Sequence, residues 1–313
     1  MEQADTLGAI GEGATLARIF PRLPAAASEI LGPGDDAAVV AAPDGRFVVT
    51  TDMMIHGPDF RLAWSTGFDL GWKAAASNLS DVAAMGAVPT ALVVAIAAPA
   101  ETQVAFLESI ADGLREGCHA MAAGCGVVGG DLSVSDTLTI AVTAFGDLEG
   151  RSPVTRSGAL VGDTVAVAGV LGEAAAGLRL LFEHGVTDPG ALRDDPRVIA
   201  QLRPHPPIAA GVTAALAGAT SMIDLSDGLA LDARRVARAS GVAFDLSRAA
   251  LGGLDALTGG EDHSLLATFS RDVPAGFRAI GRVVEGEGVL VDGEPFEARG
   301  GWDPFADWSG EAG

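Results

Sequence analysis

The stretch "DLGWKAAASNLSDVAAMGAVPTALVVAIAA" (residues 69–98) contains a predicted helix followed by a predicted strand. Its first part, 69–85, is rich in alanine, repeats apolar residues at near-helical spacing, and is ended by Gly86 and Pro89. Its last part, 90–98, is a continuous apolar run that is typical of a buried strand. A helix followed directly by a buried strand favours a mixed α/β architecture.

Length and pattern together predict the fold class α/β (α+β), with two mixed α/β domains. The chain has 313 residues, which fits two domains of roughly 150 residues each. Helix and strand patterns alternate up to about residue 148 and begin again after residue 155. We therefore expect residues 1–149 and 150–313 to form separate domains.

Several further segments give specific expectations. Strands are predicted at 37–43 and 46–52, linked by the "PDG" turn. The strand "SMIDL" (221–225) precedes the helix "LALDARRVARAS" (229–240), and the polar segment 188–198 predicts a loop.

Composition excludes several classes of partner. The net charge of −21 argues against a nucleic-acid backbone or an anionic membrane surface. No apolar run approaches the roughly 20 residues of a membrane span, and the N-terminus lacks the features of a signal peptide, so a cytoplasmic location is expected. Cys118 and Cys125 have no companion pair for a zinc site, and we expect them to be buried free thiols.

Acidic residues recur where predicted strands or helices meet glycine-rich turns. An ordinary turn or helix cap explains any one of them alone. If the turns converge, however, the like charges repel one another unless cations bind there, and oxygen ligands without His or Cys favour Mg²⁺. The residues in this context are Asp35, Asp36, Asp52, Asp131, Asp224, Asp227, Glu261 and Asp262.

Asp81 is the most informative single acidic residue. It lies in the last turn of the predicted 69–85 helix, where the helix dipole disfavours a carboxylate by roughly 0.3–1 kcal/mol. Its neighbours Leu79 and Val82 are apolar, and Asn78 shares its face three residues earlier. A surface position or a bound metal ion accounts for this carboxylate, and the apolar neighbours favour the metal ion.

The carboxylates, the glycine turns, Ser226 and Arg156 together suggest chemistry on a magnesium–nucleotide complex. The sequence contains no Walker motif, no protein-kinase signature and no "GxSxG" hydrolase motif. Its five histidines show no metal-ligand spacing.

Seven segments in order resemble the thiamine-monophosphate kinase family, whose superfamily also holds aminoimidazole ribonucleotide synthetase and selenophosphate synthetase. They span residues 32 to about 265, and "NLSDVAAMGA" and "IDLSDGL" are the most specific. The segments are "GPGDDAAVV", "VVTTDMMIHGPDF", "KAAASNLSDVAAMGAVP", "GGDLS", "TRSGALVGDTVAVAG", "IDLSDGL" and "LTGGEDHSLL".

The resemblance implies transfer of the ATP γ-phosphate to thiamine monophosphate, with several Mg²⁺ ions at one site. It also implies a homodimer in which the N-terminal sheets form a barrel, followed by a C-terminal α/β sandwich. Carried over by motif, the metal ligands are Asp36, Thr50, Thr51, Asp52, Asp81, Asp131, Asp224 and Asp227, of which Asp81, Asp131 and Asp227 are assigned to catalysis. The ATP contacts are Gly130, Asp131, Arg156 and Ser226, and the substrate contacts are Asp59, Glu261 and Trp302, with Phe305 as second choice for the aromatic.

The chain departs from the family pattern mainly where substrate is recognised. The family's "HF" after the second strand is Asp59–Phe60 here, and its "GGEDYEL" reads "GGEDHSL". Two alternatives therefore stay open. One is another ATP-dependent member of the superfamily, of the hydrogenase-maturation or selenophosphate type, although its characteristic cysteines are missing. The other is an inactive acidic protein that binds metal or nucleotide.

Overall fold

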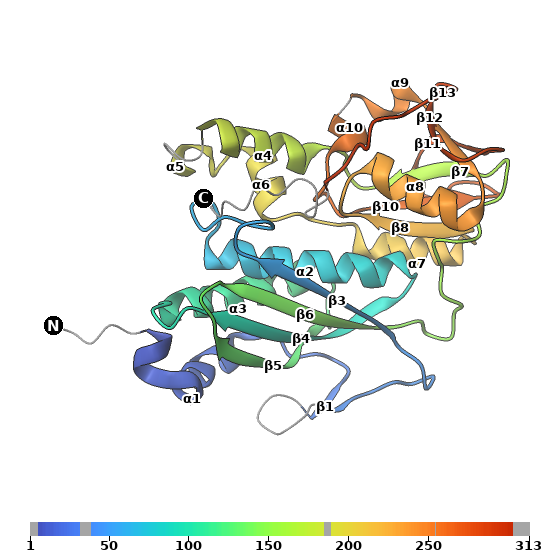
Figure 1. Cartoon of the computed structure of the whole chain (residues 1–313). Helices are drawn as coiled ribbons and strands as arrows, with labels where there is room; N and C mark the ends of the chain where they lie inside the picture. The colour runs from blue at the N-terminus through green and yellow to red at the C-terminus, as the bar shows by residue number, and fades with distance from the viewer. Residues whose placement is uncertain (1–5, 32–38, 185–188, 254, 303–313) are drawn as a thin grey trace. The chain divides into compact units, whose positions relative to one another are not determined.

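The computed structural model describes residues 6–31, 39–184, 189–253 and 255–302, and Figure 1 shows the course of the chain. The chain is a mixed α/β protein that divides into two compact units. Within the described residues, the first unit comprises 6–79 and 89–147, and the second comprises 80–88 and 148–302. The assignment of 1–149 and 150–313 to domains with separate roles stays a prediction.

The described part of the first unit is built on a four-stranded sheet in the order β3-β6-β4-β5. β3 (Val48–Ile55) pairs antiparallel with β6 (Thr139–Asp147), and β4 (Val88–Ala98) pairs parallel with β5 (Gly126–Val134). In β6, Ile140, Val142 and Ala144 are buried while the alternating residues are half-buried. One face of the sheet is therefore covered and the other is open.

Two long helices of the first unit, α2 (Gly67–Ala84) and α3 (Val104–Met121), lie side by side (Figure 1). Glycines make this close approach sterically feasible. A Cβ atom at Gly71 would lie 2.0 Å from the Ile110 carbonyl oxygen, and one at Gly113 would lie 2.1 Å from that of Phe68. The Gly- and Ala-rich sequence thus fixes how these two backbones pack.

The described N-terminal segments complete the first unit. α1 (Leu7–Ile19) and η1 (Phe20–Arg22) pack beside α3 and over β4 and β5, where Leu16, Phe20, Leu107 and Val127 line a small apolar cavity. β1 (Glu29–Leu31) and β2 (Val39–Val40) form a separate two-stranded sheet. Cys118 and Cys125 are buried free thiols, as predicted.

In the described second unit, seven strands form one sheet in the order β13-β12-β9-β11-β7-β10-β8. Among the described residues, the strand pairs of this sheet are antiparallel except for β12 and β9, which are parallel. The strands are β7 (Thr164–Ala168), β8 (Ser221–Leu225), β9 (Ala243–Leu246), β10 (Ser264–Phe269), β11 (Arg278–Val284), β12 (Gly288–Val291) and β13 (Glu294–Pro295).

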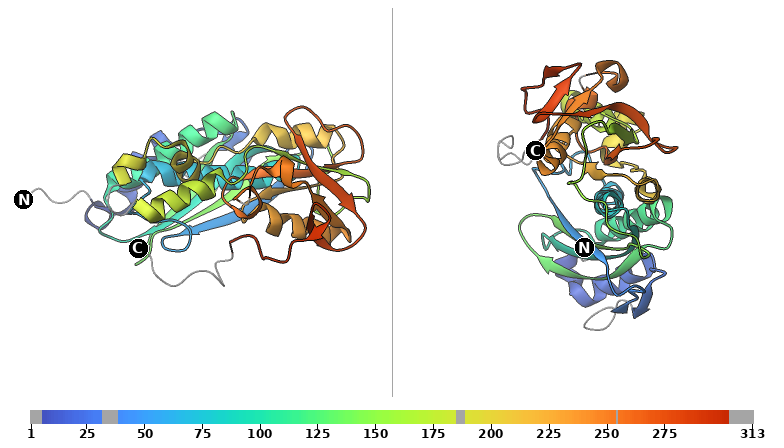
Figure 2. Two further views of the ribbon diagram at one scale, coloured as in Figure 1. Left: turned by 90° about the horizontal axis from the view of Figure 1, so that it is seen from above. Right: turned by 90° about the vertical axis from the view of Figure 1, so that its right-hand side faces the viewer.

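The helix α8 (Leu229–Ser240) lies along this sheet, as can be followed in Figure 1 and Figure 2. Leu229, Ala233 and Val236 bury its apolar side in the same cluster as Phe244 and Leu266. The remaining helices are α4 (Glu173–His184), α5 (Pro189–Leu192), α6 (Pro196–Leu202), α7 (Ile208–Leu216), α9 (Arg248–Leu251) and α10 (Asp255–Thr258). None of the helices in the described residues has the length and apolar character needed to span a membrane.

The prediction of a loop at 188–198 is wrong. The described part of this segment contains α5 and the start of α6. Asp195 caps α6 by accepting the N–H of Arg197 at 2.9 Å, and Pro196 occupies the first turn. Both features are start signals for a helix, and they outweigh the polar composition of the segment.

The strands predicted at 37–43 and 46–52 belong to different sheets. The described part of the first is β2, which pairs with β1, whereas the second is β3, which pairs with β6. The pairing of β3 with β6 joins segments that lie far apart in the sequence, and a local pattern does not encode such a contact.

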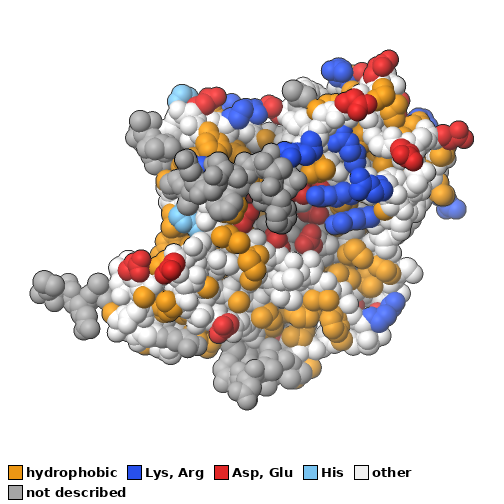
Figure 3. All heavy atoms as spheres, in the orientation of Figure 1, with side chains coloured by type: hydrophobic (Ala, Val, Ile, Leu, Met, Phe, Trp, Pro, Cys, Tyr) orange, Lys and Arg blue, Asp and Glu red, His pale blue; other side chains and the backbone are white. Residues whose placement is uncertain are grey.

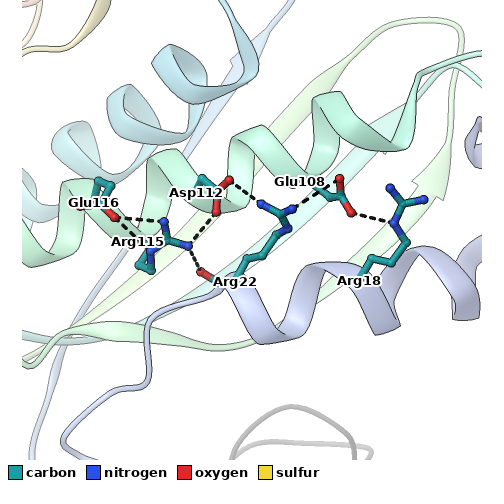
Figure 4. Close-up of polar contacts among 6 residues, drawn as sticks. All are labelled: Arg18, Arg22, Glu108, Asp112, Arg115 and Glu116. Atoms are coloured by element: carbon teal, nitrogen blue, oxygen red, sulfur yellow. Dashed lines mark hydrogen bonds and ion pairs between the residues drawn. The ribbon is translucent and has the colours of Figure 1, made fainter.

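A network of ion pairs joins α1 and η1 to α3, and Figure 4 shows its six side chains. Arg18 Nε lies 2.6 Å from Glu108 Oε1, Arg22 Nη1 lies 2.5 Å from Asp112 Oδ2, and Arg115 Nη1 lies 2.7 Å from Asp112 Oδ1. Glu108 is the most buried acid of the network, with 13% of its side chain exposed, and it also lies 3.7 Å from Arg22. Glu108 therefore links two arginines of the N-terminal segment to α3.

We expect Glu108→Ala to lower the free energy of unfolding by about 1 kcal/mol, because a partly buried link between two arginines is lost. Glu116→Ala is the matched control. Glu116 lies on the same helix, is 46% exposed and pairs with its neighbour Arg115, so its loss should stay within about 0.5 kcal/mol. Urea unfolding of both variants measures the difference. Equal losses would show that the network contributes nothing beyond ordinary surface pairs.

Candidate functional site

The turn between β8 and α8 carries two predicted site residues, Ser226 and Asp227. Gly228 adopts a φ of 127°, which favours glycine at this point. The carboxylate of Asp232, one turn into α8, accepts the N–H groups of Asp227 at 3.1 Å and Gly228 at 3.2 Å. Asp232 is completely buried, so this bond fixes the turn from inside the protein.

The same turn holds two other segments through its carbonyl groups. The N–H of Glu261 donates to the Ser226 carbonyl at 2.8 Å, and the N–H of Trp302 donates to the Asp227 carbonyl at 3.0 Å. Glu261 has a φ of 71°, a conformation that is uncommon for residues other than glycine. The structure thus brings together Ser226, Asp227, Glu261 and Trp302, which the sequence places in three separate segments.

Asp224, at the end of β8, belongs to a buried polar cluster. Its Oδ2 accepts the Ser80 hydroxyl at 3.3 Å, and His263 Nδ1 lies 3.4 Å from both Asp224 Oδ2 and Ser80 Oγ. All three residues are at most 5% exposed. Ser80 directly precedes Asp81 on α2, and Asp81 itself is half-buried. The cluster therefore connects the end of α2 to the β8 strand within the second unit.

Arg235 of α8 contacts two carboxylates at once. Its Nη2 lies 2.6 Å from Asp227 Oδ2 and its Nη1 lies 2.5 Å from Asp232 Oδ1. Burial raises the pKa of Asp232 to about 7, while the neighbouring Arg235 acts to lower it. Figure 3 shows Lys and Arg side chains gathered on the surface over α8, and this helix carries Arg234, Arg235 and Arg238. A local basic patch thus lies beside the predicted acidic ligands of the second unit.

Arg156 lies in the exposed segment between β6 and β7, and its carbonyl accepts the Ser240 hydroxyl at 3.2 Å. This bond ties the segment to the end of α8. The guanidinium of Arg156 is left at the surface, and its contact with ATP stays a prediction.

In the first unit, β3 carries Thr50, Thr51 and Asp52. Alternation along a strand puts Thr50 and Asp52 on one face and Thr51 on the other. The Thr51 hydroxyl donates to the Val142 carbonyl at 3.0 Å and accepts from Thr143 at 3.2 Å on the open face. The structure therefore does not group the three side chains, and their role as metal ligands stays a prediction.

Gly130 and Asp131 lie on β5, which is the opposite edge of the same sheet from β3. Asp131 is exposed and is aligned with Ala95 of β4. A Cβ atom at Gly130 would lie 1.9 Å from the Val94 carbonyl oxygen, so close strand packing alone requires glycine there. Gly130 therefore has a packing role, and its contact with ATP stays a prediction.

Asp59 has a structural bond in its own turn. Its Oδ2 accepts the Ile55 N–H at 2.7 Å, and its N–H donates to the Ile55 carbonyl at 3.2 Å. The carboxylate thus closes the turn after β3, and its role in substrate binding stays a prediction. Two further predicted residues, Asp36 and Phe305, lie outside the described residues.

Within the described part of the chain, no group of three or more His, Cys, Asp or Glu side chains is arranged to hold a metal ion. The predicted ligands divide between the units, with Asp52 and Asp131 in the first and Asp81, Asp224 and Asp227 in the second. Their donor atoms are all hydroxyl or carboxylate oxygens, which suits Mg²⁺. Asn78, one turn before Asp81, also presents a buried Oδ1 with no hydrogen-bond partner among the described residues. The donor chemistry therefore fits a hard cation.

Sequence reasoning missed the side chains that support the site. Asp232 falls five residues after Asp227, and Ser80 directly precedes Asp81, so both lay inside segments that were already singled out. Their role is visible only when the hydrogen bonds are known. The sequence did not single out Arg235, because α8 contains three arginines and no local pattern distinguishes them.

Comparison with known proteins gives consistent results. The family model "AIR synthase related protein, N-terminal domain" matches residues 34–148. The thiamine-monophosphate kinase of Mycobacterium tuberculosis is 47% identical over 97% of this chain and 95% of its own length. The solved thiamine-monophosphate kinase of Stenotrophomonas maltophilia is 32% identical, with a TM-score of 0.75 over 90% of this chain and 95% of its own. AaThiL complexed with AMPPCP and TMP is 33% identical, with a TM-score of 0.74 over 86% of this chain and 90% of its own.

Asp262, next to Glu261, provides a test of how this segment is held. Its buried carboxylate accepts the N–H groups of Gly172 at 2.5 Å and Ala174 at 2.8 Å, at the start of α4. Burial raises the pKa of Asp262 from 3.8 to about 6, against the lowering effect of these N–H groups. Between those values the folded chain binds a proton that the unfolded chain has released, so stability falls as the pH rises.

We therefore expect the free energy of unfolding of the wild type, relative to Asp262→Asn, to fall by about 1–3 kcal/mol as the pH rises from about 4 to about 7. The Asn side chain does not titrate, so it removes this contribution. Urea unfolding of both proteins across the pH range measures the difference. Parallel stability curves would contradict the assignment.

Proposed function

Because the chain belongs to the thiamine-monophosphate kinase family, we propose that it transfers the γ-phosphate of ATP to thiamine monophosphate, giving thiamine diphosphate and ADP. The observation that carries the proposal is the 47% identity to a thiamine-monophosphate kinase over 97% of this chain. The related AaThiL, solved with AMPPCP and TMP, supports ATP and thiamine monophosphate as the two substrates. We place the reaction in the cytoplasm, the compartment expected from the sequence.

The acceptor in this reaction is a phosphate group, which is already anionic at neutral pH. A general base is therefore unnecessary, and catalysis depends on holding two polyanions in line and neutralising the charge between them. Mg²⁺ ions held by the proposed ligand set would supply that neutralisation when bound. The chain's own contribution is to fix the ligand-bearing turns, as Asp232 does for Asp227.

On the ATP side, we propose that Gly130, Asp131, Arg156 and Ser226 contact the nucleotide. Ser226 is half-buried in the turn whose backbone Asp232 fixes. The guanidinium of Arg156 is exposed, and it is suited to the charge of a phosphate group.

On the acceptor side, we propose that Glu261 and Trp302 recognise thiamine monophosphate. Both are held through backbone hydrogen bonds to the Ser226–Asp227 turn, and Trp302 is 39% exposed. A carboxylate and an indole ring are suited to the cationic thiazolium, by charge and by cation–π stacking. Asp59 is the third proposed substrate contact, and its carboxylate also closes a turn by accepting the Ile55 N–H.

The alternative superfamily activities are not favoured. The identity to a thiamine-monophosphate kinase is 47% and extends over 97% of this chain. An inactive binding protein is the remaining alternative, and an activity assay decides against it directly.

We expect the purified chain to form thiamine diphosphate from Mg-ATP and thiamine monophosphate, as measured by chromatography of the product. Asp81→Asn should lower turnover by about 100-fold, because it removes a proposed metal ligand without changing side-chain volume. Asp272→Asn, an exposed carboxylate of the same unit, is the control and should leave turnover unchanged. Absence of product at every magnesium concentration would overturn the proposed function. Normal turnover of Asp81→Asn would remove Asp81 from the ligand set.

We also propose a homodimer formed through the open face of the first unit's sheet. Val49 and Met53 of β3 are 54% and 53% exposed on this face, opposite Phe145 and Ala141 of β6. Apolar residues exposed side by side on an edge strand favour burial against a partner. The family resemblance points to a second copy of this chain as that partner.

Light scattering after size exclusion should therefore give twice the chain mass of 31.4 kDa for the wild type. Val49→Asp should shift the protein toward one chain mass, because it buries an unpaired charge at the proposed interface. Leu216→Asp is the control, since Leu216 is 72% exposed on α7 of the other unit. A wild type that elutes with a single chain mass would overturn the dimer proposal.

A further inference from the structure

Arg235 forms an ion pair with the proposed metal ligand Asp227, with 2.6 Å between Arg235 Nη2 and Asp227 Oδ2. Its other guanidinium nitrogen lies 2.5 Å from Asp232. The guanidinium therefore bridges the carboxylates of Asp227 and Asp232 with two separate N–H groups. This fork geometry is a property of arginine that lysine does not reproduce.

The two carboxylates differ in their freedom to move. Asp232 is completely buried and also holds the N–H groups of Asp227 and Gly228, so it anchors Arg235 in place. The Asp227 side chain is 27% exposed and that of Arg235 is 40% exposed. The Asp227–Arg235 contact is thus the exposed half of the bridge, and it can open while the buried half stays closed.

We infer that Arg235 is a built-in counter-ion for Asp227, which a divalent cation must displace from that carboxylate in order to bind. The inference rests on the proposed function, which makes Asp227 a metal ligand. A carboxylate oxygen at 2.6 Å from a guanidinium cannot also accept the full charge of a cation without weakening the ion pair. Arg235 therefore lowers the affinity of the site for metal and offsets part of the negative charge at the turn when no metal is bound.

Two features of the surroundings strengthen the need for such a counter-ion. The Asp224 carboxylate ends the strand that leads into the same turn, and Asp232 lies beneath the turn, so three acidic side chains fall within nine residues. Without a cation their repulsion disfavours the turn. Arg235 supplies one positive charge at this place in a chain whose net charge is −21.

The direct test is binding of Mn²⁺, as a spectroscopic probe for Mg²⁺, to the nucleotide-free protein by electron paramagnetic resonance. We expect Arg235→Gln to bind Mn²⁺ about 3- to 10-fold more tightly than Arg238→Gln, as expected for loss of one partly exposed ion pair. Arg238 lies on the same helix and is exposed, so Arg238→Gln removes the same charge without touching Asp227. Asp227→Asn should bind Mn²⁺ more weakly than the wild type.

Equal Mn²⁺ affinity of Arg235→Gln and Arg238→Gln would overturn the inference, because only general charge would then matter. Asp227→Asn that binds as tightly as the wild type would overturn it too, since Asp227 would not be a ligand. Arg235→Lys covers the case in which Arg235→Gln does not fold, as judged by its thermal melt. Its single ammonium cannot bridge both carboxylates, so its affinity should exceed that of the wild type, and an unchanged affinity would overturn the inference.

These outcomes are independent of the activity assay. If the chain forms thiamine diphosphate but Arg235→Gln binds Mn²⁺ no more tightly than Arg238→Gln, the inference about Arg235 is wrong and the proposed function stands. If the chain forms no product but Arg235→Gln binds Mn²⁺ more tightly, the inference about the Asp227 carboxylate stands and the proposed function is wrong.

Discussion

The buried carboxylate of Asp232 is the interaction on which the site of the second unit depends. Removing a charged group from water is costly, and here three donors offset the cost: two backbone N–H groups and the Arg235 guanidinium. In return, the backbone of Asp227 and Gly228 is fixed. The carbonyls of the same turn then receive the N–H groups of Glu261 and Trp302, so one buried side chain orders three segments that are distant in the sequence.

This arrangement also explains why the acidic residues do not behave as a uniform cluster. The Asp232 carboxylate accepts backbone N–H groups and pairs with Arg235. The Asp224 carboxylate accepts the Ser80 hydroxyl and lies beside His263. Asp227 is the most exposed of the three, with an ion pair that faces the surface. Asp232 and Asp224 are therefore bound to buried protein groups, whereas the Asp227 carboxylate is accessible from the surface.

The parts of the fold that the sequence predicted well are those set by local patterns. α8 and β8 begin and end where the apolar spacing and the glycines at 228 and 241 indicated, and α2 differs from its prediction by two residues at the start and one at the end. The strands β12 and β13 were not predicted, because they are short and flanked by glycine. The order of strands in each sheet could not be predicted from the sequence, because it depends on pairings between distant segments.

The strand order of the first unit's sheet constrains the proposed ligand set. Asp52 lies on β3 and Asp131 lies on β5, with β6 and β4 between them. Three inter-strand spacings separate the two residues by about 14 Å across the sheet. Mg²⁺ binds oxygen at about 2.0–2.1 Å, and an aspartate side chain is short, so one ion cannot bind both carboxylates within a single sheet. If Asp52 and Asp131 both act as metal ligands, as proposed, they therefore bind separate ions in any one copy of the chain, and the proposal then requires several cations.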